Sequence, residues 1–305
     1  MKMTGSLLFF LLMNYIIPSA QTIEKKYNNQ IISESITGTV VRYPNFNSKF
    51  VDSRNVDIWL PEGYDSALTE KYPVLYMHDG QNVFDAKTSF IGVDWGVDET
   101  MTKLISDSKI KKAIIVAVWN NGDKRFTEYM PNKAYSKLKN QNILSMIKSR
   151  FTSDPLSDQY LSFLVSELKP FIDSTYRTLT TRDNTFIGGS SMGGLISAYA
   201  VCEYPEIFGG AACLSTHWTT GEGIMIDYLS EKLPDPATHK FYFDYGTLTL
   251  DAQYEPYQKK MDEIMKTKGW TENVNWITRK YEGEEHSERA WKKRIDIPLV
   301  FLLGK

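Results

Sequence analysis

Short apolar runs alternate with amphipathic segments along most of the chain. The run Ala-Ile-Ile-Val-Ala-Val-Trp at residues 113–119 is apolar throughout, which is typical of a central parallel strand covered on both faces. Similar runs predict strands at residues 38–43, 56–60, 72–77, 185–189, 211–215, 240–245 and 275–281. Helical periodicity predicts helices at residues 95–105, 156–176, 192–202, 254–266 and 287–303, with a kink at Pro170. This alternation predicts an α/β fold with a mostly parallel central sheet and helices on both faces.

The segment of residues 120–155 does not fit this alternation. It carries many Lys, Asn and Ser residues and few apolar periods, and it is too long for an ordinary connection. We interpret it as an insertion over the carboxyl edge of the sheet, where ligands bind in this architecture. A plain surface excursion is the alternative. Since no composition break marks a second domain, residues 21–305 are predicted to form a single domain that includes this insertion.

Residues 1–20 have the layout of a secretory signal peptide. Lys2 supplies a positive charge, residues 7–17 form an apolar run of about eleven residues, and Pro18-Ser19-Ala20 ends in a small residue suited to cleavage. The run is shorter than the roughly 20 residues of a membrane span, so we expect no stable membrane span. A buried N-terminal helix is the alternative. The signal predicts a secreted or periplasmic protein.

The composition is that of an ordinary globular protein. Of 305 residues, 42% are apolar and 24% charged, and 35 Lys and Arg against 37 Asp and Glu leave a net charge of −2. Because there is no basic excess to neutralise phosphates, nucleic acid is not an expected partner. The histidines lack the spacing of H-E-x-x-H and similar motifs, so no metal or other cofactor is expected.

The strongest chemical signal is the run Gly-Ser-Ser-Met-Gly-Gly at residues 189–194, which contains G-x-S-x-G centred on Ser191. It follows a predicted strand and opens a predicted helix. This is the setting of a nucleophile elbow, a strained turn that holds a serine at the end of an α/β-hydrolase sheet. A phosphate-binding loop is the alternative, but it would need a Lys before Ser or Thr, or the pattern G-x-G-x-x-G. Ser191 is therefore the candidate nucleophile.

The four histidines restrict the choice of a general base. Proteins with this elbow place the triad in the chain order Ser, then Asp or Glu, then His. His286 follows Ser191 and lies in a loop after the last predicted strand, so we assign it as the base. His239 lies in a polar turn and is expected to be solvated. His78 and His217 are expected to line a pocket or to be satisfied interior histidines.

The acid of a triad should follow the predicted strand at residues 240–245. Asp251 lies in the loop beyond this strand, where a carboxylate can reach the imidazole and fix its tautomer. Asp244 is the alternative, but it lies inside the strand. We therefore predict that Asp251 orients His286.

An oxyanion hole needs two backbone N–H groups. One is provided by the residue after the nucleophile, and the other by the loop after the third strand. These positions are Met192 and the loop of residues 78–82, where Gly80 allows a close backbone approach. We assign the second donor to Gln81.

Four runs resemble one family of α/β-hydrolases. They are Leu-Tyr-Met-His-Asp-Gly-Gln-Asn at 75–82, Arg-Phe-Thr-Glu-Tyr-Met-Pro at 125–131, the elbow at 189–194, and Tyr-Pro-Glu-Ile-Phe-Gly at 204–209. Such runs are similar to those of the putative-esterase family, which includes S-formylglutathione hydrolase, feruloyl and acetylxylan esterases of carbohydrate-esterase family 1, enterobactin-type siderophore esterases and mycolyltransferases. The resemblance covers most of residues 50–305 and implies an α/β-hydrolase fold.

The resemblance and the signal peptide together imply an exported serine carboxylic-ester hydrolase that acts on a small-molecule or polysaccharide ester. Short-acyl or aryl esters of carbohydrates, of the acetyl or feruloyl type, are the expected substrates. One alternative is a siderophore esterase, whose anionic substrate would need cations such as Arg125 and Lys124. Another is a catalytically silent carbohydrate-binding relative.

Four residues are expected to contact the substrate. Arg125 is the cationic one, and Trp119, Trp218 and Tyr254 could stack on sugar or aryl rings. Each of these aromatic residues could instead belong to the core.

Overall fold

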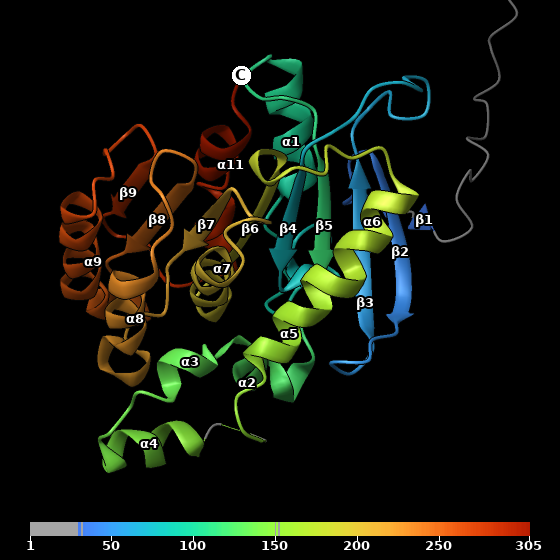
Figure 1. The fold of residues 1–305 in the computed structure, drawn as a ribbon. Helices are drawn as coiled ribbons and strands as arrows, with labels where there is room; N and C mark the ends of the chain where they lie inside the picture. Colours follow the sequence, from blue (N-terminus) through green and yellow to red (C-terminus); the bar gives the residue numbers. More distant parts are fainter. Residues whose placement is uncertain (1–29, 32, 150, 152) are drawn as a thin grey trace, which may run out of the picture.

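The computed structural model describes residues 30–31, 33–149, 151 and 153–305, so the predicted signal peptide at 1–20 lies outside the described residues. Within these ranges one sheet has the strand order β1-β2-β3-β5-β4-β6-β7-β8-β9 (Figure 1). Its strands are β1 (Gln30–Ile31), β2 (Thr39–Phe46), β3 (Arg54–Leu60), β4 (Val74–His78), β5 (Ile114–Val118), β6 (Thr185–Ser190), β7 (Gly210–Leu214), β8 (Lys240–Gly246) and β9 (Trp276–Tyr281).

Most of the sheet is parallel, as the alternation of strands and helices predicts. Strands β5, β4, β6, β7, β8 and β9 run in one direction, whereas β1, β2, β3 and β5 pair antiparallel in succession. The short strand β1 escapes prediction because two residues carry no periodicity. The predicted fold class is confirmed, and the carboxyl ends of the parallel strands meet at one edge of the sheet.

Helices cover both faces of the sheet (Figure 1). The helices are α1 (Val97–Ser106), α2 (Arg125–Tyr129), α3 (Asn132–Tyr135), α4 (Gln141–Lys148), α5 (Ser157–Phe163), α6 (Lys169–Thr175), α7 (Met192–Glu203), α8 (Ile224–Lys232), α9 (Glu255–Thr267), α10 (Glu288–Lys292) and α11 (Asp296–Leu303). Alternate side chains of β4 enter different cores: Val74 and Tyr76 pack with α5 to α9, and Leu75 and Met77 pack with α1, α10 and α11. None of the helices in the described ranges is both long and apolar enough to cross a membrane.

Two predicted helices are not continuous. Residues 287–303 form α10 and α11 rather than one helix, and Pro298 lies in the first turn of α11, where its missing N–H removes no helical hydrogen bond. The predicted helix at 156–176 is interrupted by a π-helical segment (Leu164–Leu168), in which the N–H of Lys169 bonds the carbonyl of Leu164. This segment immediately precedes the turn that contains Pro170, which cannot donate a backbone hydrogen bond.

The segment of residues 120–155 contains the short helices α2, α3 and α4, and these lie beside the carboxyl ends of the parallel strands (Figure 1). Helix α2 is joined to β3 by a buried ion pair between Glu128 and Arg54, with a closest approach of 2.7 Å. Asn140 caps α4, and Ile143 and Ile147, one turn apart, are its buried residues. The segment therefore has its own anchors and covers the edge at which Ser191 lies.

Candidate active site

Ser191 occupies a strained turn between β6 and α7. Its backbone has φ 58° and ψ −121°, an arrangement that residues with a side chain rarely adopt. The turn is held by hydrogen bonds from the Ser191 N–H to the Leu214 carbonyl (2.9 Å) and from the Leu195 N–H to the Ser191 carbonyl (3.1 Å). The sequence expectation of an elbow at this position agrees with this geometry.

Two glycines make the turn possible. A Cβ on Gly189 would lie 3.1 Å from the His78 Cβ, and a Cβ on Gly193 would lie 3.3 Å from both that atom and an Asp79 oxygen. Strand β6, helix α7 and the end of β4 are thus in closer contact than side chains at these two positions would permit. The close contact leaves the Ser191 side chain at the carboxyl edge of the sheet.

His286 and Asp251 meet at this edge. His286 lies in the loop between β9 and α10, and its Nδ1 is 2.5 Å from Asp251 Oδ1. The backbone N–H of His286 donates to Thr249 Oγ1 (2.8 Å), while the Trp291 ring packs edge-on against the imidazole with centroids 5.1 Å apart. Because His286 and Ser191 line the same cavity, the structure brings all three predicted triad residues to one place.

The Asp251 carboxylate is buried but has three hydrogen-bond donors. Oδ1 faces His286, and Oδ2 accepts from Ser215 Oγ and from the Gly246 N–H, both at 2.6 Å. Burial by itself would raise the pKa of Asp251, but these hydrogen bonds and the nearby His286 hold that pKa below its ordinary value. An ionised carboxylate accepts only, so Nδ1 of His286 carries a proton, and in the neutral imidazole Nε2 is then the acceptor.

Ser215 determines part of this arrangement and was not identified from the sequence. Its Oγ accepts hydrogen bonds from Trp291 Nε1 (3.0 Å) and Arg294 Nη2 (2.8 Å). A hydroxyl has two lone pairs and one proton, so with both lone pairs occupied the proton must point to Asp251. The sequence signal was the position of Ser215 at the end of the predicted strand at residues 211–215; in the structure β7 ends one residue earlier, at Leu214.

Asp244, the alternative acid, has a different role. It pairs with Arg294 at 2.9 Å and accepts hydrogen bonds from the Ser215 N–H and the Tyr242 hydroxyl. Burial raises the pKa of Asp244, although Arg294 opposes the shift. The structure therefore places Asp251, and not Asp244, against His286.

His217 and Tyr254 form a second polar group beside Ser191. The Tyr254 hydroxyl lies 2.5 Å from His217 Nδ1, and the His217 N–H donates to the Ser191 carbonyl at 3.2 Å. Burial and the Asp251 charge raise the pKa of Tyr254, while a hydrogen bond with the Ser191 side chain acts in the opposite direction. Tyr254, predicted to contact substrate, is 1% exposed, and its ring instead packs edge-on against the His286 imidazole with centroids 5.8 Å apart.

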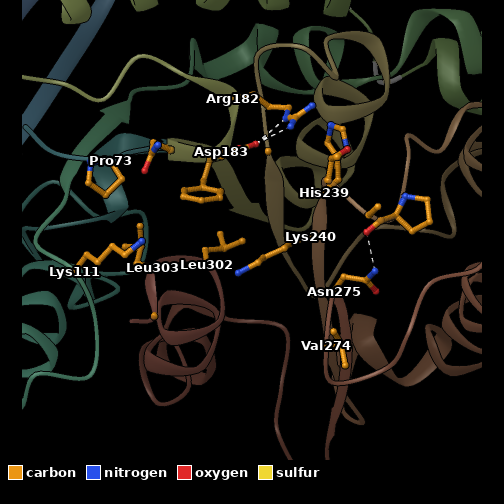
Figure 2. Close-up of a pocket in the computed structure, with 17 residues that line it drawn as sticks. Pro73, Lys111, Arg182, Asp183, His239, Lys240, Val274, Asn275, Leu302 and Leu303 are labelled. Carbon is orange, nitrogen blue, oxygen red and sulfur yellow. Dashed lines mark hydrogen bonds and ion pairs between the residues drawn. The ribbon is translucent and has the colours of Figure 1, made fainter.

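His239 lies at the edge of the sheet opposite Ser191, whereas His78 is buried next to the elbow glycines Gly189 and Gly193. His239 is buried, not solvated as expected, since Nε2 bonds the Pro205 carbonyl (2.8 Å) and Nδ1 lies near the Thr238 hydroxyl. It lines a cavity at the amino ends of β4, β6 and β8, the edge opposite Ser191 (Figure 2). His78 bonds the Tyr160 hydroxyl at 2.8 Å, and burial lowers the pKa of His78 to about 3, so it is a neutral interior histidine.

Arg125 reaches the site but is already paired. Its Nε and Nη2 donate to the two oxygens of Asp79 at 2.6 and 2.7 Å. Burial would raise the pKa of Asp79, but the Arg125 charge and hydrogen bonds hold that pKa below its ordinary value. The pair fixes α2 against the loop that carries Gly80 and Gln81, so Arg125 offers little uncompensated charge to a ligand.

Two cavities open beside Ser191, and both are lined by Ser191 and Arg125. We call the first the His286 cavity; it has a volume of about 670 Å³ and is lined by His286, Gln81 and Trp291 among others. We call the second the α4 cavity; it has a volume of about 540 Å³. Its other lining residues include Phe126, Met146, Ile147, Met192, His217, Thr219, Thr220, Leu250 and Gln253. The hydrophilic segment of residues 120–155 thus places apolar side chains next to Ser191.

Two residues expected to contact substrate lie elsewhere. Trp119 donates to Asp57 (2.9 Å) and packs under the Arg42 guanidinium, and Trp218 is 1% exposed with its Nε1 bonded to Gln258 (2.7 Å). Within the described part of the chain, neither indole lines a cavity beside Ser191. Both expectations are corrected: the polar partners of these indoles lie on the sheet and on α9.

The predicted oxyanion donors both adjoin Ser191. Met192 is the first residue of α7, and Gln81 lies in the single 3₁₀ turn of Gly80–Asn82. Backbone N–H groups in a first turn have no partner within their own helix. A Cβ on Gly80 would lie 2.6 Å from the Ala117 carbonyl, so the close approach expected of this glycine is present.

One group of acidic residues has donor atoms close enough to hold a cation. Among the described residues, Asp94, Asp98 and Glu99 form this group, with their oxygens within 4.8 Å of one another. Lys292 Nζ already bonds Asp94 at 2.9 Å, and burial raises the pKa of Asp98 to about 8. At neutral pH the ammonium and a proton therefore compensate much of the charge of this group.

Comparison with known proteins supports the resemblance seen in the sequence. A model of the family described as "Putative esterase" matches residues 48–298. The uncharacterized protein YbbA of Bacillus subtilis is 22% identical over 261 residues, which cover 83% of this chain and 94% of that protein. The endo-1,4-beta-xylanase/feruloyl esterase of Xylanibacter ruminicola is 26% identical over 205 residues, which cover 62% of this chain but 22% of that protein.

Solved structures share the fold. A ferulic acid esterase superposes with a TM-score of 0.64 at 18% identity, covering 87% of this chain and 97% of that one. The enterobactin esterase FES of Shigella flexneri superposes with a TM-score of 0.63 at 16% identity, covering 88% of this chain and 59% of that one. At these identities the likeness shows the α/β-hydrolase fold.

Replacing Ser215 with alanine should raise the pKa of Asp251, because the carboxylate loses one donor. A carboxyl group whose pKa is lower in the folded state than in the unfolded state stabilises the fold at pH values above its unfolded-state pKa of about 3.9. This stabilisation is lost as the pH falls through the folded-state pKa. The variant should therefore be less stable than the wild type by about 1–3 kcal/mol at pH 7. The deficit should shrink as the pH falls below about 4, as measured by urea unfolding across a pH series.

Ser197→Ala is the matched control, since this buried hydroxyl bonds the Gly193 carbonyl and no carboxylate. The loss of unfolding free energy in Ser197→Ala should not vary with pH. A Ser215→Ala deficit that is equally independent of pH would contradict the role assigned to Ser215.

Proposed function

The chain belongs to the family described as Putative esterase, and on this premise we propose that it is a serine carboxylic-ester hydrolase with Ser191, His286 and Asp251 as its triad. The observation that carries the proposal is the hydrogen bond between His286 Nδ1 and Asp251 Oδ1, made by a histidine that shares a cavity with the strained Ser191. This combination of hydroxyl, imidazole and carboxylate performs acyl transfer on several unrelated folds.

In the proposed reaction Ser191 Oγ attacks the ester carbonyl carbon while His286 Nε2 accepts the hydroxyl proton. The backbone N–H groups of Met192 and Gln81 stabilise the resulting oxyanion. Collapse of the tetrahedral intermediate breaks the bond to the alkoxide, which takes the proton from His286 and leaves as the alcohol. Water then gives a proton to His286 and attacks the acyl carbonyl, and collapse returns the proton to Ser191 as the acid departs.

We propose an acetyl or aryl ester of a carbohydrate as the substrate. Arg125 is paired with Asp79 and Lys124 with Asp52, so the two cations that could attract an anionic siderophore are compensated. The His286 cavity is lined by the carboxylates of Asp79, Asp123, Glu285 and Glu288 and by the guanidinium groups of Arg125 and Arg289. This excess of acids favours an uncharged substrate, and the feruloyl esterase among the relatives supports this choice.

We also propose that the protein is exported from the cytoplasm. Lys2 and the apolar run at residues 7–17 support a secretory signal, and polysaccharide esters are met outside the cytoplasm. A siderophore ester, which the likeness to an enterobactin esterase raises, is the alternative substrate.

Ser191→Ala should abolish covalent labelling by a fluorophosphonate, which reacts with an activated serine hydroxyl. The wild type should be labelled once, as measured by intact mass and peptide mapping. Turnover of p-nitrophenyl acetate should fall by roughly 10⁴-fold or more in the variant, because triad members act as a unit. Labelling of another serine would defeat the assignment of Ser191, and an unlabelled and inactive wild type would favour a silent carbohydrate-binding relative.

Asp251→Asn should reduce kcat by about 10⁴-fold while the protein remains folded, because the amide cannot hold His286 in the required tautomer. Asp244→Asn is the matched comparison. Its main effect should be on stability, with a loss of about 3–5 kcal/mol, since the buried Arg294 loses its charged partner. Circular dichroism, urea unfolding and esterase kinetics on both variants separate the two effects, and the reverse ranking in kcat would move the acid to Asp244.

The substrate class is tested with acetylated xylan, methyl ferulate and a catecholate trilactone. We expect kcat/KM for at least one of the first two to exceed that for the trilactone by about tenfold or more, because carboxylates around the His286 cavity repel an anionic substrate. Product release is followed by chromatography at two salt concentrations, because salt screens the repulsion between the carboxylates and an anionic substrate. A preference for the trilactone would assign the siderophore alternative.

A further inference from the structure

We infer that the two cavities beside Ser191 divide the substrate, with the acyl group in the α4 cavity and the alcohol in the His286 cavity. The inference rests on the proposed function, since only an ester hydrolase gives the two sides of Ser191 different chemical roles. It assigns an uncharged, largely apolar acyl group to the α4 cavity and a hydroxylated, uncharged alcohol to the His286 cavity.

Proton transfer decides which of the two cavities holds the alcohol. The departing alkoxide must receive its proton from the imidazole that earlier accepted the Ser191 proton. That imidazole lines the His286 cavity and does not line the α4 cavity in the described part of the chain. The leaving oxygen must therefore lie on the His286 side of Ser191, and the acyl substituent then extends to the other side, into the α4 cavity.

The lining of the α4 cavity suits an apolar acyl group. The apolar side chains of Phe126, Met146, Ile147, Met192 and Leu250 surround it, and Arg125, whose charge Asp79 compensates, is the charged residue among its described lining. Met146 and Leu250 are 55% and 50% exposed. Large apolar side chains that line one cavity and are exposed indicate a surface that binds an apolar group.

The lining of the His286 cavity suits a polyhydroxylated alcohol. Its carboxylates and the Gln81, Asn82 and Asn120 amides offer many hydrogen-bonding groups, while Phe90 offers a ring face. Phe90 is 84% exposed, so its ring is available to pack on the apolar face of a sugar or another ring. Polar groups combined with an aromatic ring match the two kinds of surface that a sugar presents.

The division gives the segment of residues 120–155 a definite role. Phe126 on α2 and Met146 and Ile147 on α4 supply three of the apolar walls, and Leu250 faces them from the loop that carries Asp251. Among the described lining residues, the turn and helix that carry Ser191 contribute Ser191 and Met192, and the loop that carries His286 contributes none. Acyl selectivity should therefore change with this segment without any change in the triad.

The test is a matrix of four esters, the p-nitrophenyl and 4-methylumbelliferyl esters of acetate and butyrate. Acyl selectivity is the ratio of kcat/KM for butyrate to that for acetate with one alcohol, and alcohol selectivity is the ratio between the two alcohols with one acyl group. The variants are Met146→Ala/Leu250→Ala for the α4 cavity and Phe90→Ala for the His286 cavity. Leu68→Ala, a 74% exposed leucine between β3 and β4, is the matched control.

The α4-cavity variant should lower acyl selectivity by about fourfold for each methylene that loses its apolar contact and leave alcohol selectivity unchanged. Phe90→Ala should change alcohol selectivity and leave acyl selectivity unchanged, and Leu68→Ala should change neither. These side chains are exposed, so the variants should fold, and fluorophosphonate labelling of Ser191 confirms an intact site.

Two results would overturn the inference. If Phe90→Ala changes acyl selectivity and the α4-cavity variant changes alcohol selectivity, the acyl group lies in the His286 cavity and the alcohol in the α4 cavity. Unchanged ratios in labelled, active variants would mean that the cavities are not separate subsites. Neither result resembles failure of the proposed function, which would show as a wild type that hydrolyses none of the four esters.

Discussion

The site depends on keeping the Asp251 carboxylate ionised while it is buried. Burial alone opposes the charge, and hydrogen bonds from His286, Ser215 and Gly246 overcome that opposition. Since Arg294 and Trp291 occupy both lone pairs of Ser215, the direction of its proton is fixed by residues near the C-terminus. Removing any part of this network would weaken the orientation of His286.

The parallel sheet explains why so many separate segments contribute to one site. Carboxyl ends of adjacent parallel strands meet at one edge, and the residues just after β4, β6, β7, β8 and β9 include Gln81, Ser191, Ser215, Asp251 and His286. Helix α10 begins at this edge, so that Trp291 contacts His286 directly, and α11 ends at the opposite edge. The same geometry puts His239, at the start of β8, on the opposite edge.

The sequence by itself determined the class of fold, the elbow at Ser191 and the assignment of His286 and Asp251 as candidates. These conclusions depend on local signals: apolar runs of strand length, glycines around one serine, and the position of an acid and a histidine after successive strands. Local signals suffice because chain order and strand direction decide which residues reach the carboxyl edge. The break between α10 and α11 was missed since the apolar pattern continues through Pro298.

Only the tertiary structure decided which side chains contact one another across that edge. Trp119 and Trp218 resemble ligand-stacking residues in the sequence, yet each indole N–H is bonded to Asp57 or Gln258, away from the cavities. The sequence likewise cannot show that Ser215 bonds Asp251 or that Met146 and Ser191 line one cavity. Such contacts join segments far apart in the chain, and packing and hydrogen-bond satisfaction in three dimensions select them, whereas propensity and periodicity act over only a few residues.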